Sequence, residues 1–389
     1  MRPIPRVVGS DRGEIVVRIG FDVRMLHFGG IGRYVSALVR HYPGLVRGEE
    51  MVLFAHPRDF VSIHSHAPNF DLHGISSSIY SIAEHFEMAL QLRRVGLDLL
   101  HVPHYTPPLR APCPLVVTIH DLIHLHYPRS RLHEAYTRRM LSEVRRRASM
   151  VLVGSQAVAQ DVVECADIEP ERVRVIPYGV EDDWAAPSEG TEVEAFLRRM
   201  RIERPYVLNV TNGLPHKGLP LLLEAFREFL PEALRAEGGG VRLVLAGRGS
   251  NRPEVMEDIA DCGLGEDTVL ALGGLSEREM RLAYASAAAV VVASDYEGFG
   301  LPVLEGLAAG VPVIASDVGG LPEAAGDAGF LFESGSVAAL VAALYKVVLG
   351  LSGEEREQCI REGITQAKRF SWETTARATL AAYQRALSY

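Results

Sequence analysis

Several features of extracellular and membrane proteins are missing from this sequence. Its 389 residues include only four cysteines, with no CxxC pair, so we interpret them as buried thiols of a reducing compartment. No apolar run approaches the roughly 18 residues that a membrane helix needs. The first residues lack the apolar core and the cleavage site of a signal peptide. We therefore expect a cytoplasmic protein.

Lysine is almost absent, which makes each lysine informative. The chain contains only Lys217, Lys346 and Lys368, and arginine supplies the other positive charges. Residues 1–185 are neutral, with 21 Arg against 21 Asp and Glu. Residues 186–389 carry 19 Lys and Arg against 28 acidic residues, and hold the whole net charge of −9. Nucleic-acid binding needs clustered cations that neutralise phosphates, so we expect no nucleic-acid partner.

Short apolar runs alternate with helical patterns, and the alternation restarts near residue 204. Such Val, Ile and Leu runs between helices are typical of parallel sheets covered on both faces. We predict an α/β protein with two doubly wound, Rossmann-like domains facing a central cleft, 1–185 and 186–371, with a polar linker at 180–193. Ligands of such sheets bind beyond the C-terminal ends of the strands.

The individual elements follow from periodicity. In the first half we expect strands in 14–23, 114–121, 149–155 and 173–180, and helices in 34–42 and 133–148. In the second half we expect strands in 205–213, 241–247, 267–275, 289–294 and 311–316, and helices in 219–230, in 278–287 and after Pro302.

Two glutamates flank a glycine-rich loop in the stretch "SDYEGFGLPVLEGLAAGVPVIAS". Glu297 ends a predicted strand, and Glu305 lies in the first turn of the helix that Pro302 begins. Gly298 and Gly300 let a ligand approach backbone amides, and a helix start favours anions. A carboxylate can accept two hydroxyl hydrogen bonds, as from a ribose or sugar diol. The structural alternative is that Glu305 complements the helix dipole and Glu297 caps the turn.

Lys217 lies between a predicted strand with its glycine-containing turn and the next predicted helix. A point cation at this place can offset the growing charge of a diphosphate leaving group. The alternative is a solvated surface lysine.

Three glycines, Gly29, Gly30 and Gly32, form a second turn between a strand and a helix in "FGGIGRY". Their backbone amides could reach phosphates or a sugar. The turn departs from the GxGxxG dinucleotide fingerprint, and glycine turns are common at such junctions.

Five histidines gather within 26 residues, which raises the question of a metal site. His120 ends a strand at the edge where ligands bind, so we expect it to contact the transferring group. We expect His101 and His104 to satisfy local backbone groups. His124 and His126 alternate, but no Cys or carboxylate set in the sequence completes a tetrahedral zinc site, so we expect no metal.

The helix predicted at 133–148 carries five arginines, interrupted by Glu143. A cationic helix can rest on anionic lipid. The alternative is a solvated face.

Taken together, these motifs resemble the retaining glycosyltransferases of family 4, which have the GT-B fold and an E-x7-E signature. The resemblance covers roughly residues 15 to 385. It is carried, in order, by "FDVRMLHFGGIGRYVSALV", "VVTIHDLIHLHYP", "VLVGSQAVAQDV", "VIPYGV", "LPHKGLPLLLEAF", "LAGRG", "YEGFGLPVLEGLAAGVPVIAS" and "FSWETTARATLAAY". The branch with "GIGRY" and "HDL" resembles mannosyltransferases of bacterial surface-polysaccharide synthesis.

The resemblance implies a role for each site residue. Glu305 would hold the ribose hydroxyls of the nucleotide, and Glu297 would bind hydroxyls of the donor sugar. Lys217 would contact the diphosphate, and His120 would lie against the transferred sugar. The backbone amides of the two glycine loops would also bind the donor, namely those of Gly29, Gly30 and Gly32, and those of Phe299, Gly300 and Leu301.

Two further expectations follow from the family pattern. The last helix, 372–389, would cross back to complete the N-terminal, acceptor-side domain. Many relatives have an arginine shortly before the lysine, where this chain has Asn and Gly in "NGLPHK". Arg248 is the candidate substitute for that second cation.

The implied reaction is retaining, metal-independent transfer of a hexosyl unit from a nucleotide-diphosphate sugar. Mannosyl transfer from GDP-mannose to a saccharide or lipid-linked acceptor is the first expectation, without a cofactor. The alternatives are a UDP-sugar-dependent glucosyl or galactosyl transferase, an isomerase or phosphorylase on the same scaffold, and a non-catalytic nucleotide-sugar-binding relative. A version docked at the inner face of an anionic membrane also remains open.

Overall fold

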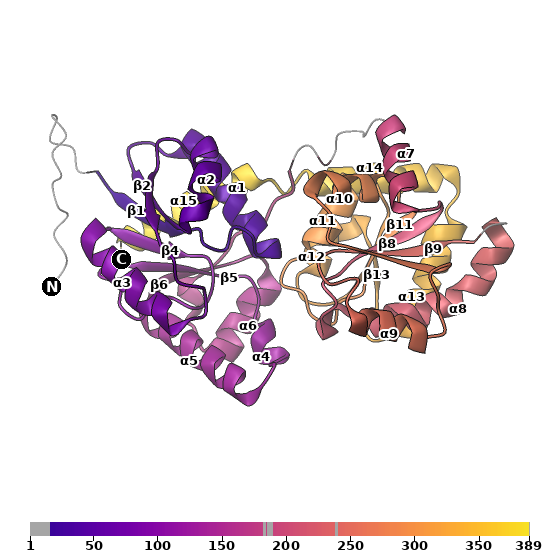
Figure 1. The fold of residues 1–389 in the computed structure, drawn as a ribbon, viewed down its shortest axis with the longest axis horizontal. Coiled ribbons are helices and arrows are strands. Elements are labelled where there is room, and N and C mark those ends of the chain that lie inside the picture. The colour runs from indigo at the N-terminus through magenta and orange to yellow at the C-terminus, as the bar shows by residue number, and fades with distance from the viewer. Residues whose placement is uncertain (1–15, 182–183, 185–189, 238–239, 389) are drawn as a thin grey trace. The chain divides into compact units, whose positions relative to one another are not determined.

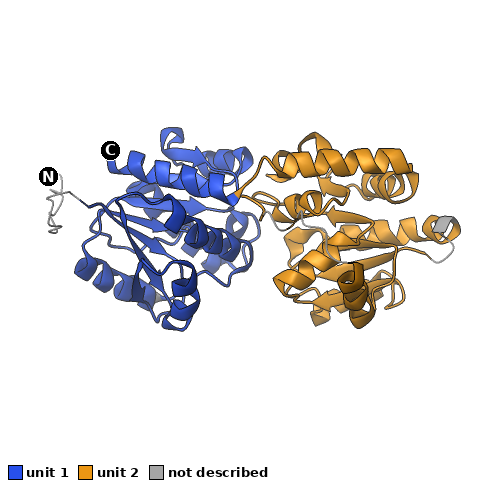
Figure 2. Ribbon diagram, turned by 90° about the horizontal axis from the view of Figure 1, so that it is seen from above, with its two compact units in different colours: residues 1–178, 372–389 blue, residues 179–371 orange. Residues whose placement is uncertain are grey.

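The structure, a computed structural model, describes residues 16–388 except 182–183, 185–189 and 238–239 (Figure 1). The chain divides into two compact units (Figure 2). Unit 1 comprises Met1–Tyr178 and Trp372–Tyr389, and unit 2 comprises Gly179–Ser371. The predicted domain boundary after residue 185, and much of the predicted linker, lie outside the described residues.

Unit 1 is a parallel sheet flanked by helices (Figure 1). Its strands are β1 (Arg18–Asp22), β2 (Glu50–Ala55), β3 (Asp71–Gly74), β4 (Leu99–Val102), β5 (Leu115–Ile119), β6 (Ala148–Val153) and β7 (Val173–Val175). Its helices are α1 (Gly29–Leu45), α2 (Phe60–His66), α3 (Ile82–Val95), α4 (Ile123–His126), α5 (Arg131–Arg147), α6 (Gln156–Ala166) and α15 (Trp372–Ser388).

Unit 2 repeats this architecture (Figure 1). Its strands are β8 (Tyr206–Val210), β9 (Arg242–Ala246), β10 (Val269–Gly273), β11 (Ala289–Val292), β12 (Val313–Ser316) and β13 (Phe330–Phe332). Its α-helices are α7 (Gly190–Met200), α8 (Leu219–Glu237), α9 (Pro253–Asp261), α10 (Glu277–Ala285), α11 (Leu301–Ala308), α12 (Leu321–Ala325), α13 (Val337–Leu344) and α14 (Gly353–Ala367).

In each sheet the strand order reverses direction at the strand that comes first in the sequence of that unit, β1 or β8. The order is β3-β2-β1-β4-β5-β6-β7 in unit 1 and β10-β9-β8-β11-β12-β13 in unit 2. Every strand pair is parallel, which confirms the predicted class. The predicted strands and helices are each present. In such sheets ligands bind where the order reverses, outside the carboxyl ends of the strands, here β1 with β4 and β8 with β11.

Burial and capping explain why these segments form these elements. The central strands β5 and β11 are buried along their whole length, which removes their Val and Ile side chains from water. Serine side chains cap the helices that follow loops, as Ser155 does by accepting a hydrogen bond from the amide of Val158 at the start of α6. Ser276 forms a complete capping box with Glu279 in α10.

The last helix, α15, belongs to unit 1 and packs against α1, as predicted (Figure 1). The hydroxyl of Tyr383 in α15 contacts the hydroxyl of Tyr42 in α1 at 2.8 Å and His101 Nδ1 in β4 at 2.6 Å. These buried bonds attach the end of the chain to the first half of the sequence. The two tryptophans are divided between the units, Trp372 in unit 1 and Trp184 in unit 2, and both are buried.

None of the described helices is by itself long and apolar enough to cross a membrane. One sharply bent pair, Val337–Gly350 with Gly353–Ala367, reaches the required length and composition only when the two are taken together.

Candidate active site

The carboxyl edge of the unit 2 sheet brings together Lys217 and Glu297, which are 80 residues apart in sequence. Lys217 Nζ donates to Glu297 Oε2 at 2.6 Å, and Ser294 Oγ donates to the same oxygen at 3.2 Å. The side chains are 16% and 17% exposed, so the ion pair is partly buried but still reached by solvent. Lys217 follows β8 and Glu297 follows β11, the two strands at which the sheet order reverses.

Close backbone packing sets this arrangement. The amide of Asp295 donates to the carbonyl of His216 at 2.8 Å, which joins the loop after β11 to the turn before α8. Gly218 adopts a left-handed φ of 61°, and a Cβ there would lie 1.8 Å from the carbonyl oxygen of Ala293. Only glycine allows this approach, so the turn that carries Lys217 packs directly against the residue that follows β11.

Helix α11 begins where the glycine-rich loop ends. Gly300 is its N-cap with a φ of 101°, and Leu301 is its first residue. Phe299 is buried and packs edge-on against Phe370, with ring centroids 5.8 Å apart. This contact restrains the loop, and the amides of the first turn of α11 follow directly after it, at a helix start that favours an anion.

Glu305 lies one turn into α11 and is almost completely buried, at 2% exposure. The hydroxyl of Tyr284 in α10 donates to Glu305 Oε2 at 2.9 Å. Trp184 in turn packs edge-on against Tyr284, at 5.0 Å between ring centroids. Sequence reasoning missed Tyr284 and Trp184, because no short motif connects them to the glutamate.

Arg248 lies in the loop after β9 and is exposed. Its neighbours Gly247 and Gly249 both have positive φ values, of 116° and 101°. A Cβ at Gly249 would lie 2.4 Å from the carbonyl oxygen of Asn212, so this loop packs against the turn that leads to Lys217. The two cations thus come from adjacent loops of one strand edge.

In unit 1 the predicted glycine turn forms the start of α1. Gly29 is the first residue of the helix, with a φ of 50°. A Cβ at Gly32 would lie 2.5 Å from the carbonyl oxygen of Leu26, so the chain can fold back this closely only at glycine. Gly30 is exposed, as is the N-cap residue Phe28.

His120 lies just after β5 with both ring nitrogens engaged inside unit 1. Nε2 is 2.9 Å from the carbonyl oxygen of Pro103, so Nε2 carries the proton, and the Tyr178 hydroxyl donates to Nδ1 at 2.6 Å. Burial lowers the pKa of His120 to about 4, and the hydrogen bond to Pro103 only partly offsets this. At neutral pH the ring is therefore uncharged, and a ligand reaching either nitrogen must replace a protein partner.

A buried ion cluster, which sequence reasoning missed, occupies the same strand edge of unit 1. Arg24 makes two bonds to Asp22, at 2.7 and 2.9 Å, and contacts Glu84 Oε2 at 3.3 Å. Burial raises the pKa of Asp22, but the charge and hydrogen bonds of Arg24 outweigh this effect and hold it well below its usual range. Burial raises the pKa of Glu84 to about 7.

Two of the predicted histidine roles differ from the structure. His101 contacts the Tyr383 hydroxyl and, at 2.8 Å, Thr118 Oγ1, which are side chains distant in sequence and not local backbone. His104 accepts from the nearby amide of Thr106 at 3.2 Å, as expected, but also faces Asp22 Oδ2 at 3.8 Å. Both rings are buried because β4 is a central strand, which the sequence reading did not include.

The five arginines predicted for the helix at 133–148 lie in α5, and each has an acceptor. Arg138 pairs with Glu134, Arg139 and Arg146 pair with Glu143, Arg145 pairs with Asp167, and Arg147 donates to the carbonyl of Pro108. The exposed pairs of Arg138 and Arg145 contribute only about 0–1 kcal/mol each, so these two arginines can exchange partners at little cost. Glu143 is buried, so its two arginines are needed to compensate its charge.

Comparisons with known proteins give a consistent result across the chain. A model described as "Glycosyltransferase Family 4" matches residues 28–184, and one described as "Glycosyl transferases group 1" matches residues 196–366. The chain is 28% identical to the O-antigen chain mannosyltransferase B of Escherichia coli, over 91% of this chain and 96% of that protein. It is 31% identical to the MMP alpha-(1->4)-mannosyltransferase of Mycolicibacterium hassiacum, over 64% of this chain and 57% of that protein.

Solved structures with the same fold include a glycosyltransferase from Rickettsia africae, with a TM-score of 0.74 and 19% identity over 96% of this chain and 99% of that one. Anabaena HepE in complex with UDP and glucose gives a TM-score of 0.75 and 20% identity, over 95% of this chain and 99% of that one.

Proposed function

The chain belongs to the family 4 retaining glycosyltransferases of GT-B fold, and on that premise we propose that it transfers a mannosyl unit from GDP-mannose to a saccharide or lipid-linked acceptor. The observation that carries the proposal is the Lys217–Glu297 pair at the strand edge where the sheet order reverses. The choice of mannose is supported by the relatives, several of which are named mannosyltransferases.

In the proposed reaction the bond between the anomeric carbon and the β-phosphate oxygen breaks, and an acceptor hydroxyl attacks the same face. The proton of that hydroxyl passes to the departing phosphate oxygen. Negative charge grows on the diphosphate, and Lys217 together with the amides of the first turn of α11 stabilises it. Members of this family work without a metal, and here cations and peptide dipoles take that part.

Lys217 has to change partners during donor binding. In the structure its ammonium group is neutralised by Glu297 at 2.6 Å. A diphosphate that approaches Lys217 offers stronger acceptors, and its own sugar hydroxyls can donate to the released Glu297 carboxylate. The ion pair thus holds both groups ready for opposite ends of the donor's pyrophosphate–sugar linkage. Arg248, from the neighbouring loop, would supply the second cation.

The remaining donor contacts are proposed as follows. Glu305 binds the ribose hydroxyls, which requires nucleotide binding to open its buried position beside Tyr284. The amides of Phe299, Gly300 and Leu301 bind the sugar or phosphate, as do those of Gly29, Gly30 and Gly32 in unit 1. His120 contacts the transferred sugar in exchange for its bond to Tyr178 or to Pro103.

Calorimetry with GDP, UDP and ADP on the wild type and on Glu305→Gln tests the donor pocket. We expect GDP to bind best, and the substitution to weaken it, since an amide accepts fewer hydroxyl bonds than a carboxylate. Preference for UDP would overturn the mannose proposal and favour a UDP-glucose or UDP-galactose donor. No binding of any nucleotide would favour the non-catalytic alternative.

The stereochemistry is tested by NMR of the product formed from GDP-mannose. We expect the α configuration of the donor to be kept in the new linkage. A β linkage would contradict the proposed same-face attack.

The acceptor is tested separately. If product forms only when an external hydroxyl acceptor is present, the reaction is transfer and not isomerisation. Comparing a free saccharide with a lipid-linked one as acceptor identifies the acceptor class.

A further inference from the structure

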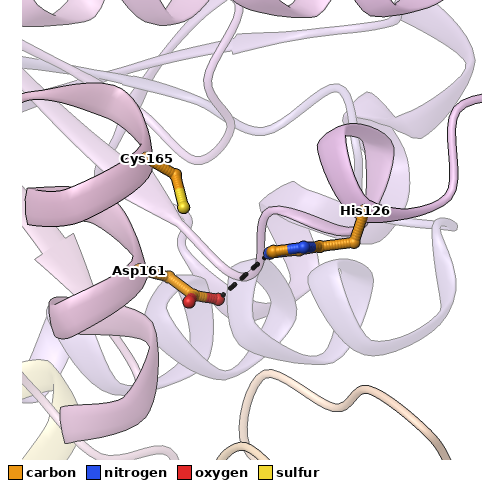
Figure 3. A group of neighbouring side chains, drawn as sticks. All are labelled: His126, Asp161 and Cys165. Carbon is orange, nitrogen blue, oxygen red and sulfur yellow. Dashed lines mark ion pairs between the residues drawn. The ribbon is translucent and has the colours of Figure 1, made fainter.

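Three metal-ligating side chains converge on the surface of unit 1, and none of them is among the residues proposed to bind the donor. His126 ends α4, and Asp161 and Cys165 lie on α6 (Figure 3). His126 Nε2 is 3.5 Å from Asp161 Oδ2, and the ligand atoms of all three residues lie within 4.8 Å of one another. The sequence reading found no Cys or carboxylate to join the histidines, because these two lie 35 and 39 positions after His126.

Helix geometry explains why two of the three groups share one face. Asp161 and Cys165 are four residues apart on α6, so their side chains project from successive turns of the same side. The helix is fixed at its start by the Ser155 cap, and it ends at Asp167 in a left-handed conformation. Asp161 and Cys165 are therefore carried by a regular helix whose start is stabilised by the Ser155 cap.

The separations are close to those of a metal site. Zinc bonds of about 2.0–2.3 Å in a tetrahedron place neighbouring ligand atoms about 3.3–3.6 Å apart. The His126–Asp161 distance of 3.5 Å already meets this value. The thiol, within 4.8 Å of the other two, needs to move by about 1 Å, which a small rotation of an exposed side chain provides. The expected burial of the cysteines is wrong here, since Cys165 is exposed.

We propose that His126, Asp161 and Cys165 bind a zinc ion, with water as the fourth ligand. Zinc binds imidazole, thiolate and carboxylate ligands, whereas calcium and magnesium take oxygen ligands alone. The contact between His126 and Asp161 involves two of the groups, and the thiol supplies a third ligand.

A metal at this place would act on structure and not on the transfer reaction. α4 begins three residues after His120, and the amide of Ile123 is held by Asp121 Oδ1 at 3.0 Å. A zinc ion would fasten the other end of this short helix to α6. It would thereby stabilise unit 1 and restrain the segment that follows His120, while the family's chemistry stays independent of metal.

Cobalt titration of the full chain, without a tag and after treatment with a chelator, tests the site. Co²⁺ serves as the probe because its thiolate complexes absorb strongly in the near ultraviolet, and Zn²⁺ is then added to displace it. We expect one equivalent to bind with a thiolate band, which Cys165→Ser abolishes. His126→Gln and Asp161→Asn should each weaken binding at least about tenfold.

Two matched variants and a thermal measurement make the test specific. Cys359→Ser removes another thiol and His64→Gln another exposed histidine, and neither should change the titration. Zn²⁺ should raise the melting temperature of unit 1 in the wild type but not in the triple ligand variant. The proposal is overturned if no thiolate band appears, if the band persists in Cys165→Ser, or if binding requires Cys165 but neither His126 nor Asp161.

Discussion

Units 1 and 2 share one sheet topology but divide the charged chemistry between them. Of the 14 histidines, 13 lie in unit 1, and all three lysines lie in unit 2. At the strand edge where each sheet reverses order, unit 1 has the Asp22–Arg24–Glu84 cluster and unit 2 has the Lys217–Glu297 pair. The corresponding positions of the two units therefore hold different sets of charged side chains.

The difference lies in how far water reaches each ion pair. The side chains of Arg24 and Asp22 are 3% and 1% exposed, so their charges are satisfied by each other. Such a pair loses hydration on burial, and breaking it leaves an uncompensated charge. The Lys217–Glu297 pair keeps contact with solvent and can exchange partners with an incoming anion. We infer that the unit 1 cluster shapes the loop after β1, whereas the unit 2 pair is kept available for ligand.

The largest effect should come from breaking the buried cluster. Arg24→Met leaves Asp22 and Glu84 without their cation, and we expect unit 1 to lose about 3–5 kcal/mol of unfolding free energy. Urea unfolding followed by Trp372 fluorescence, in a Trp184→Phe background, measures this. The matched variant Arg377→Met removes an exposed α15 pair with Glu373 and should cost less than about 0.5 kcal/mol. Equal midpoints for the two variants would contradict the comparison.

Removing the unit 2 cation should instead affect the rate. Lys217→Met removes the charge that the proposed mechanism places beside the leaving diphosphate, so we expect kcat for the proposed transfer from GDP-mannose to fall about 10²–10³-fold. The unfolding midpoint of unit 2, followed by Trp184, should change much less than that of unit 1 in Arg24→Met. Lys368→Met, which replaces an exposed lysine of the same unit, serves as the control. Unchanged kcat in Lys217→Met would remove this residue from the proposed mechanism.

Lowering the pH should destabilise unit 1 more than unit 2. Burial lowers the pKa of His101 to about 3 and that of His120 to about 4, so both stay neutral in the fold but take up protons in the unfolded chain below about pH 6.5. Their contribution to stability is complete above that pH and is lost as the pH falls toward 4. Glu84, with its pKa near 7, acts in the opposite direction, since its contribution is largest below about pH 4.5 and lost toward pH 7.

Burial lowers the pKa of His104 as well, so at least three histidines destabilise unit 1 in acid, and their combined effect exceeds the opposite effect of Glu84. We therefore expect unit 1 to lose roughly 2 kcal/mol or more between pH 6.5 and 5. Unit 2, with one histidine in its sequence, should change little. Thermal melts at several pH values, with Trp372 and Trp184 as separate reporters, provide the measurement. A parallel fall of both midpoints would argue against this assignment.

The smallest effect concerns the nucleotide pocket. Tyr284→Phe deletes the hydroxyl that holds Glu305 Oε2 at 2.9 Å and leaves the ring beside Trp184. A typical net contribution of about 1 kcal/mol for one hydrogen bond corresponds to about a 3- to 10-fold weaker Kd for GDP. Calorimetry detects this, and Tyr206→Phe, a second buried tyrosine of unit 2, is the control for general loss of packing. Unaltered affinity would show that Glu305 needs no such support.

Sequence reasoning could place residues at the sheet edge when the residues around them form a recognisable local pattern. Lys217 and Glu297 each follow an apolar strand and precede a helix, and parallel strands place such positions on one edge. It missed contacts that only folding creates. Glu84 lies 60 residues from Arg24 in an ordinary helix, and Tyr383 lies 282 residues from His101. Burial of an ion pair, and the convergence of α4 with α6, depend on packing between elements and leave no local pattern.

The return of α15 to unit 1 has a consequence for synthesis. The sheet of unit 1 is translated first, yet the helix that supplies Tyr383 to His101 and packs on α1 is translated after the whole of unit 2. Unit 2 is contiguous and can fold as soon as it leaves the ribosome, whereas unit 1 must wait with part of its core uncovered. The usual order, with the N-terminal domain complete first, is thus reversed in this chain.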